Sequence, residues 1–188
     1  YSLMKFIKYL IIIFISINSP IKADSNQNLI KELKKGGKLI FIMDAYAPGG
    51  GDPKHFDIND CNTQRNLSNI GKNQAKKIGS FFTDNNIPID EIYSSEWCRC
   101  KDTASIAFNR FKTKNFLNSF FSSQFSKNKD SQMKKLKKFI NKWNENKNLV
   151  FVTHYVVIFE SLNHGPSSGE IVISNKDFKV IDTIEIEY

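Results

Sequence analysis

A buried strand that ends in a glycine-rich loop constrains this chain more than any other feature. Residues 38–43 are rich in Leu, Ile and Phe, and the loop that begins at Asp44 carries Pro48 and three glycines at 49–51. A short apolar run that is closed by Pro and Gly is typical of a strand buried on both faces. In α/β sheets, ligand sites lie just beyond the carboxyl ends of the strands. Residues 43–47 therefore occupy a position where chemistry is expected.

The rest of the chain alternates helical and extended patterns, which predicts an α/β layered domain without internal repeats. Helices are expected over residues 27–35, 69–84, 96–109, about 130–146 and 155–162. Strands are expected over 38–43, 89–94, 114–123 and 148–153, and an antiparallel pair over 170–174 and 179–187. Ser68 is expected to cap the helix at 69–84. The long loop at 44–66 is of a kind that is usually functional or disordered.

The first 23 residues resemble an export signal. A short basic region at 5–8 precedes an apolar run at 9–17, which is too short to span a bilayer comfortably. Residues 21–23 resemble a cleavage site, although Ile at its first position is imperfect. We therefore expect a signal peptide at 1–23, a single domain at 24–188, and a periplasmic or secreted protein. An uncleaved membrane anchor is the alternative.

The composition is that of a globular protein, with 40% hydrophobic and 24% charged residues. The formal net charge is +8, and removing the signal segment with its Lys5, Lys8 and Lys22 lowers it to +5. A modest positive charge favours anionic small molecules or surfaces. The sequence carries no zinc-finger spacing or basic-aromatic RNA motif. We expect neither a nucleic-acid partner nor a membrane partner after signal cleavage, and the oligomeric state stays open.

Three cysteines, Cys61, Cys98 and Cys100, leave one odd thiol if two of them pair in an oxidising compartment. A bridge from Cys61 to either Cys98 or Cys100 joins two candidate active-site loops, and three free thiols are the alternative. The spacing does not choose between these states. Because no four-ligand spacing accompanies the cysteines, we expect no metal site and no cofactor.

Two polar side chains follow other expected strands. Arg99 lies in the first turn of the helix after residues 89–94, where a helix start and a forked cation both favour an anion. His154 follows the strand at 148–153 directly. A lone His after a strand is more often structural than catalytic, but an arginine at an equivalent strand end favours a functional role. Together these residues indicate an anion site at the edge of the sheet.

Several separate segments resemble, in the same order, the histidine phosphatase (phosphoglycerate mutase-like) superfamily, and its small periplasmic branch in particular. They are residues 45–53, 60–68, Gly71, Gln74-Ala75, 93–104, 117–121, Thr153-His154 and 166–170. The resemblance spans about 38–175 and implies a three-layer α/β/α sandwich with a mostly parallel sheet. It also implies a phosphate pocket of two histidines and two or three arginines. In that family one histidine attacks phosphorus, and water then releases phosphate from the phosphohistidine.

The resemblance assigns phosphate binding to Arg99, Arg65 and His154, with His154 as the second histidine. It also exposes a departure, because the family's first strand ends in Arg-His and this chain has Met43-Asp44. Shifting the alignment along the chain brings no neighbouring arginine or histidine to the positions of Met43 and Asp44.

Other residues near the expected pocket have less certain roles. His55 is the only nearby histidine, but it lies deep in the loop, where we expect a surface or substrate contact. The proton donor stays open among Glu96, Asp102 and Glu170, and Glu170 is alternatively a cap of the turn into its strand.

The Met43-Asp44 pair predicts a pseudophosphatase, inactive or severely impaired. Met43 cannot donate the charged hydrogen bond that contributes about 1.5–3 kcal/mol. An ionised Asp44 about 4 Å from a phosphoryl charge repels it by roughly 4 kcal/mol at an effective dielectric constant of about 20. That energy corresponds to about a thousandfold in affinity. The resemblance to the small periplasmic branch implies that any remaining ligand is a phosphorylated small molecule, such as a sugar phosphate or a lipopolysaccharide-core phosphate.

Two alternatives to an impaired phosphatase remain. One is a non-catalytic periplasmic binding module, in which Asp44 accepts hydrogen bonds from a cationic or hydroxyl-rich ligand; an internal Asp44–Arg99 ion pair that simply closes the pocket is the inert version. The other is an active phosphatase that uses Asp44 as its nucleophile. Such aspartyl-phosphate chemistry generally needs a metal, and no second carboxylate is clearly placed to hold one.

Overall fold

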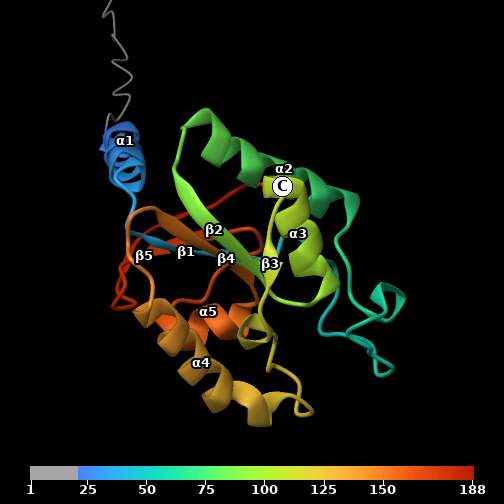
Figure 1. Cartoon of the computed structure of the whole chain (residues 1–188). Helices are drawn as coiled ribbons and strands as arrows, with labels where there is room; N and C mark the ends of the chain where they lie inside the picture. Colours follow the sequence, from blue (N-terminus) through green and yellow to red (C-terminus); the bar gives the residue numbers. More distant parts are fainter. Residues whose placement is uncertain (1–20) are drawn as a thin grey trace, which may run out of the picture.

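The structure is a computed structural model that describes residues 21–188 (Figure 1), and side chains from residue 27 onward. The signal peptide expected at 1–23 lies almost entirely outside the described residues. Within residues 21–188, every helix is too short or too polar to cross a membrane.

A six-stranded sheet forms the middle layer, with the strand order β3-β2-β4-β1-β5-β6. Its strands are β1 (Leu39–Met43), β2 (Ile89–Ser94), β3 (Lys112–Thr113), β4 (Asn148–Thr153), β5 (Ile171–Ser174) and β6 (Val180–Ile184). β4 pairs in parallel with both β1 and β2, and β2 with β3. β5 and β6 add an antiparallel pair at the β1 edge. The mostly parallel α/β sheet expected from the sequence is confirmed.

Both faces of the central strands are apolar, which is why helices cover both. Leu39 and Phe41 of β1 point into one hydrophobic cluster, and Ile40 and Ile42 point into the other. All four side chains are fully buried. Continuous apolar runs of this kind mark strands that are covered on both faces.

The helices form the two outer layers (Figure 1). They are α1 (Ile21–Lys34), α2 (Asn69–Asp84), α3 (Cys98–Phe108), α4 (Lys129–Asn141) and α5 (Tyr155–Leu162). Residues of α1, α2 and α3 pack into one hydrophobic cluster, and residues of α4 and α5 into the other. As expected, Ser68 caps α2, its side chain accepting a hydrogen bond from the Gly71 amide at 3.2 Å. The bounds of α2, β2, β4 and α5 agree with the sequence prediction.

The strand predicted at 114–123 is wrong. The strand β3 ends at Thr113, before this stretch begins, and residues 115–117 form a short 3-10 helix. Phe116, Leu117 and Phe120 all bury into the same hydrophobic cluster. Since strand side chains alternate between two faces, three inward side chains at this spacing do not suit a strand.

Other element boundaries moved less. α4 ends at Asn141 rather than near 146, and α1 begins at Ile21 rather than at 27. α3 begins at Cys98 rather than at Glu96, because Trp97 has extended backbone angles and serves as the cap. Such shifts of a few residues are usual at helix ends.

The loop after β1 is tied to the helix that follows β2. Its only regular segment is a 3-10 helix, Cys61–Thr63. Cys61 forms a disulfide with Cys98, the first residue of α3, and Cys100 is a buried free thiol. Of the pairings left open by the sequence, the structure has Cys61–Cys98.

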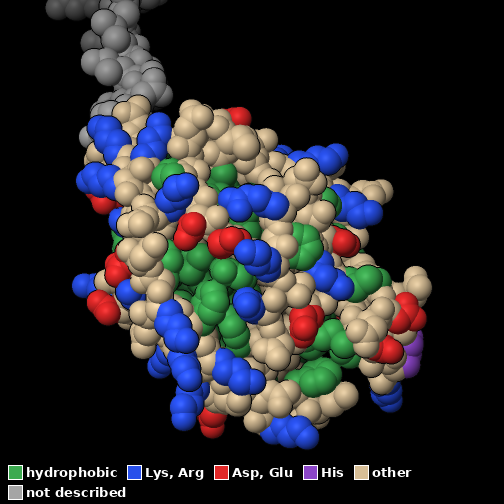
Figure 2. Space-filling view, viewed as in Figure 1, with side chains coloured by type: hydrophobic (Ala, Val, Ile, Leu, Met, Phe, Trp, Pro, Cys, Tyr) green, Lys and Arg blue, Asp and Glu red, His purple; other side chains and the backbone are tan. Residues whose placement is uncertain are grey.

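Charged side chains are interspersed over the visible surface. Figure 2 shows Lys and Arg scattered among Asp and Glu, rather than gathered into one broad basic patch.

Candidate functional site

Three neighbouring strands end side by side and bring Ser95, His154 and Asp44 together. Met43 of β1 pairs with Thr153 of β4, and β2 lies on the other side of β4. The ladder continues by one residue, because the amide of Asp44 donates to the Thr153 carbonyl at 2.9 Å. The Ser95 amide donates in the same way to Val152 at 3.0 Å. The strand-end argument from the sequence therefore places Asp44 and His154 correctly.

Asp44 lies buried at the centre of the site, with 2% of its surface exposed. Its Oδ2 atom lies 3.2 Å from Nε of Arg99, and its Oδ1 atom lies 3.4 Å from Nδ1 of His154. The Arg99 Nε atom has no partner in hydrogen-bond geometry, so the contact with Asp44 is an ion pair rather than an aligned hydrogen bond. The acid thus contacts Arg99 and His154, two of the three residues to which the resemblance assigned phosphate binding.

Arg99 is held in place by a second carboxylate, Asp52. Its Nη1 atom donates to Oδ1 of Asp52 at 2.8 Å, and its Nη2 atom donates to Nδ1 of His154 at 3.2 Å. The other oxygen of Asp52 accepts from the Trp97 indole at 3.0 Å. Sequence reasoning did not single out Asp52, because it lies in an irregular loop where no periodicity or spacing marks a side chain.

His154 is neutral in this arrangement. Because a guanidinium only donates, Nδ1 accepts from Arg99, and the ring proton resides on Nε2. Nε2 donates to Oγ of Ser95 at 2.8 Å, and Ser95 donates to Oδ1 of Asn118 at 3.1 Å. Burial lowers the pKa of His154 and outweighs the opposing contact with Asp44. Ser95 was a missed site residue, and its place directly after β2 was the signal that could have found it.

The site balances its own charges. Burial by itself raises the pKa of Asp44, but the charge of the neighbouring Arg99 guanidinium holds that pKa below its usual value. Burial also raises the pKa of Asp52, but the charge of Arg99 leaves the pKa of Asp52 below its usual value. The pKa of Arg99 is lowered by burial but raised overall, first by Asp44. Two carboxylates thus face the guanidinium groups of Arg99 and Arg65 and offset their charge, while Lys54 also lines the cavity.

Arg65 completes the predicted phosphate-binding set. Its Nη1 atom donates to the carbonyl of Ala47, and its backbone amide donates to Oδ1 of Asp52 at 3.1 Å. Burial and the charge of Arg99 lower the pKa of Arg65. Arg65, Arg99, His154, Met43 and Asp44 all line one cavity of about 660 Å³. The structure therefore gathers every residue that the resemblance placed in the pocket.

The candidate proton donors and His55 lie outside that cavity lining. Glu170 is buried, lies 2.7 Å from Nε2 of His164, and accepts from the Ser167 amide at 2.7 Å. The hydrogen bond from the Ser167 amide agrees with the alternative role expected for Glu170, a cap of the turn into its strand. Glu96 accepts from the Asn118 amide at 2.6 Å, and His55 is exposed on the loop.

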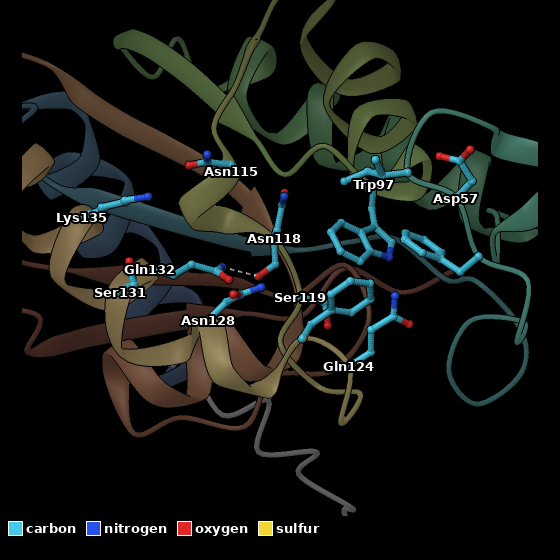
Figure 3. A pocket seen from close by; sticks show the side chains of 13 residues that line it. Asp57, Trp97, Asn115, Asn118, Ser119, Gln124, Asn128, Ser131, Gln132 and Lys135 are labelled. Atoms are coloured by element: carbon cyan, nitrogen blue, oxygen red, sulfur yellow. Dashed lines mark hydrogen bonds between the residues drawn. The ribbon is translucent and has the colours of Figure 1, made fainter.

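A second cavity of about 570 Å³ adjoins the first and is rich in amide and hydroxyl groups (Figure 3). It shares Trp97, Ser119 and Gln124 with the first cavity. Gln132 donates to the Asn118 carbonyl at 2.8 Å, which fixes one wall. Asp57 and Lys135 also line this cavity, but most of its polar groups are uncharged donors and acceptors, which suit a hydroxyl-rich group.

Comparisons with known proteins support the resemblance. The model of the histidine phosphatase superfamily (branch 1) matches residues 60–119. A phosphoglycerate mutase from Thermus thermophilus is 12% identical with a TM-score of 0.56, and the alignment covers 80% of this chain and 99% of that one. No curated protein matched the sequence.

Two solved SixA structures are also similar to this chain. A putative phosphohistidine phosphatase SixA from Agrobacterium tumefaciens is 18% identical with a TM-score of 0.54, over 80% of this chain and 98% of that one. The protein histidine phosphatase SixA in complex with tungstate is 10% identical with a TM-score of 0.55, over 78% and 96%. At these identities the likeness shows the fold, and the predicted three-layer α/β architecture and resemblance to the superfamily are confirmed.

Proposed function

Because the chain has the histidine phosphatase fold, we propose that it is a phosphatase-like protein whose phosphate pocket is retained in part and blocked by Asp44. One observation carries this proposal: the carboxylate of Asp44 contacts Arg99 at 3.2 Å and lies 3.4 Å from His154. The Asp44 carboxylate therefore occupies the side chains, Arg99 and His154, that a bound oxyanion would need to contact. The expected result is a protein that is inactive or severely impaired as a phosphohistidine phosphatase.

The missing nucleophile supports the same conclusion. Covalent phosphoryl transfer requires an activated nucleophile within reach of the reacting atom. His154 is neutral and donates its Nε2 proton to Ser95, while its Nδ1 atom faces Asp44 and Arg99. Neither ring nitrogen is free to attack phosphorus. If a ligand is retained, we expect it to be a phosphorylated small molecule such as a sugar phosphate.

Hydrolysis of p-nitrophenyl phosphate by the purified protein tests this proposal. We expect no turnover above background in the wild type, and measurable turnover in the Met43→Arg/Asp44→His double variant. That double variant carrying also His154→Ala is the matched control and should lose the gained activity. Wild-type turnover at an ordinary enzymatic rate, abolished by His154→Ala, contradicts the proposal. Wild-type turnover abolished by Asp44→Asn alone instead supports Asp44 as the nucleophile.

The amide-rich second cavity favours a second candidate, a binding module for a hydroxyl-rich ligand. Gln124 lies between the two cavities and its side chain is exposed, so it can contact a ligand that spans both. Calorimetric titration with glucose 6-phosphate and with glucose distinguishes the candidates. Binding of both sugars that weakens in Gln124→Ala supports the module, whereas heat from neither sugar favours an inert pocket closed by the Asp44–Arg99 pair.

We also propose that the protein is exported and works in the periplasm or outside the cell. The apolar run at 9–17 and the Cys61–Cys98 disulfide support this, since disulfides persist in oxidising compartments. Mass spectrometry of the protein from membrane and soluble fractions of a producing cell tests it. A mature chain that begins near residue 24 is expected, and a full-length chain confined to the membrane fraction contradicts cleavage.

A further inference from the structure

Exposed aromatic side chains gather at the opening of the larger cavity. Phe121 is 73% exposed and Tyr155 is 44% exposed, and both line the cavity of about 660 Å³. Phe159, which is also exposed, stacks on Tyr155 with nearly parallel rings whose centroids lie 5.9 Å apart. Isolated apolar side chains are ordinary on a protein surface, but a group of them beside a cavity marks a binding site. We call Phe121 and Tyr155 the aromatic rim.

Further aromatic rings line the cavity beside this rim. Phe56, Trp97 and Phe125 line it, and all three also line the second cavity. The rings of Phe56 and Trp97 are stacked with their centroids 4.9 Å apart, and Phe125 packs edge-on against each of them at 5.6 Å. Aromatic side chains bind other flat rings in offset-stacked or edge-on arrangements. The lining therefore favours a ligand that has a planar ring over one that carries only hydroxyl groups.

The charges of the lining narrow the choice of ring. The cations Lys54, Arg65 and Arg99 line the cavity together with the carboxylates Asp44 and Asp52, which leaves one formal positive charge in excess. Aromatic rings also attract cations such as quaternary ammonium groups. An excess of positive charge opposes such a ligand and favours a neutral or anionic one. We therefore expect the ring to be uncharged.

Gln124 adds a polar group close to the aromatic rim. It follows Phe121 by three positions, its side chain is exposed, and it lines both cavities. A primary amide presents a donor and an acceptor side by side. That pair matches the edge of a heteroaromatic base, as glutamine matches adenine in nucleic acids. The lining therefore provides hydrogen bonds for a ring that has polar atoms on its edge.

These features of the lining fit one class of ligand, a flat ring with polar edge atoms that is joined to hydroxyl groups. We propose that the cavity binds a nucleoside, whose base stacks on the aromatic rim and whose ribose faces the amide and hydroxyl groups of the second cavity. The volume of about 660 Å³ lies within the usual range for small-molecule sites. This inference rests on the proposed function, because it names the ligand class of the same pocket.

Asp44 should decide how a phosphate on such a ligand is received. In the wild type its charge opposes a phosphate, so adenosine 5′-monophosphate should bind no more tightly than adenosine. In Asp44→Asn the order should reverse, because Arg99 then no longer faces that carboxylate. An unreversed order counts against the proposed blocking of the pocket by Asp44, whereas the binding of adenosine itself tests the stacked base.

Calorimetric titration of the purified protein with adenosine and with ribose 5-phosphate tests the inference. We expect saturable binding of one adenosine per chain and much weaker binding of ribose 5-phosphate, which lacks the ring. Phe121→Ala with Tyr155→Ala should weaken adenosine binding at least about tenfold, as the loss of aromatic side chains that stack on bases does. Ile70→Ala with Ile181→Ala removes two exposed apolar side chains outside both cavity linings and should leave the affinity unchanged.

Saturation-transfer NMR on the wild type keeps the inference testable if the rim variant does not fold. Irradiation of the protein's methyl resonances should saturate the base protons of adenosine more strongly than its ribose protons. No saturable adenosine binding, ribose 5-phosphate binding as tight as adenosine, or equal affinity in the rim and control variants overturns the inference. Wild-type hydrolysis of p-nitrophenyl phosphate contradicts the proposed inactivity instead, so the two failures are distinguishable.

Discussion

At the scale of single residues, Asp44 decides what the site can do. Its carboxylate is buried between the Arg99 guanidinium and the His154 imidazole, and the charge of Arg99 keeps it ionised despite burial. The place of Asp44 at the end of β1 could be predicted from the sequence, because the strand ends where the apolar run ends. It could not supply the partnership of Arg99 with Asp52, since that contact joins α3 to an irregular loop.

Asp44→Ala is expected to destabilise the protein by about 3 kcal/mol. Removing one partner of a buried ion pair leaves a charge without compensation, which typically costs about 3–5 kcal/mol, and Asp52 keeps the value at the low end. Urea unfolding measures the change. Asp102→Ala, on α3, is the control. Burial raises the pKa of Asp102, so the fold does not stabilise the charge of this side chain. We therefore expect its removal to change the free energy of unfolding by no more than about 0.5 kcal/mol. Equal losses in both variants contradict this account.

At the scale of elements, the helix α2 and the loop after β1 are fitted together at one glycine. A methyl group added to Gly71 would lie 2.0 Å from the carbonyl oxygen of Tyr46, whereas one added to Gly50 would meet nothing within 4 Å. The sequence predicted α2 and its Ser68 cap from local pattern. It could not predict this close approach, because the partner lies 25 positions earlier in a loop without periodicity.

Gly71→Ala should therefore lower the free energy of unfolding by about 1–3 kcal/mol or more, as overpacking against backbone does. Gly50→Ala, in open space on the same loop, should change it by less than about 0.5 kcal/mol. Thermal unfolding of the two variants beside the wild type gives the comparison. A Gly71→Ala protein as stable as Gly50→Ala shows that the loop does not pack on α2 as described.

The disulfide also acts between elements, since it ties the loop to the start of α3. It links residues 37 positions apart, and closing a loop of that length in the unfolded chain is worth about 4 kcal/mol. Reduction, or Cys61→Ala with Cys98→Ala, should shift the urea midpoint accordingly. A midpoint that is unchanged by reduction indicates that the two cysteines are not bonded in solution.

At the scale of the whole molecule, the fold was largely predictable and the site only partly so. The layers could be predicted from strands that are apolar on both faces and from the helices spaced between them, because the pattern of apolar residues is visible in neighbouring positions of the sequence. The predicted strand at 114–123 was wrong, because its aromatic residues pack into a tertiary core that no local pattern reveals. Asp52, Asn118 and the aromatic rim depend on the same long-range assembly.

Stability of the whole protein should fall as the pH is lowered from 7 to 4. The folded pKa of His154 is below its ordinary 6.5, so its contribution is present above pH 6.5 and is lost as the pH falls toward the folded value. Asp44 and Asp52 have folded pKa values below 3.8, so their contribution is lost only below that pH. Urea midpoints measured in half-unit steps follow the loss from His154 between pH 7 and pH 4, and the loss from Asp44 and Asp52 when the series is continued below pH 3.8. His154→Gln should abolish the decline that begins near pH 6.5, and a wild type equally stable at pH 7 and pH 5 contradicts the assignment.

Calorimetric titration with tungstate, the oxyanion bound in the SixA structure, tests most directly whether Asp44 occupies an anion site. Asp44→Asn keeps the shape of the side chain and removes the charge, which repels an anion about 4 Å away by roughly 4 kcal/mol. We predict undetectable or millimolar tungstate binding by the wild type, and binding at least about tenfold tighter by Asp44→Asn that is lost when Arg99→Gln is added. Tungstate binding by the wild type that equals or exceeds that of Asp44→Asn contradicts the account.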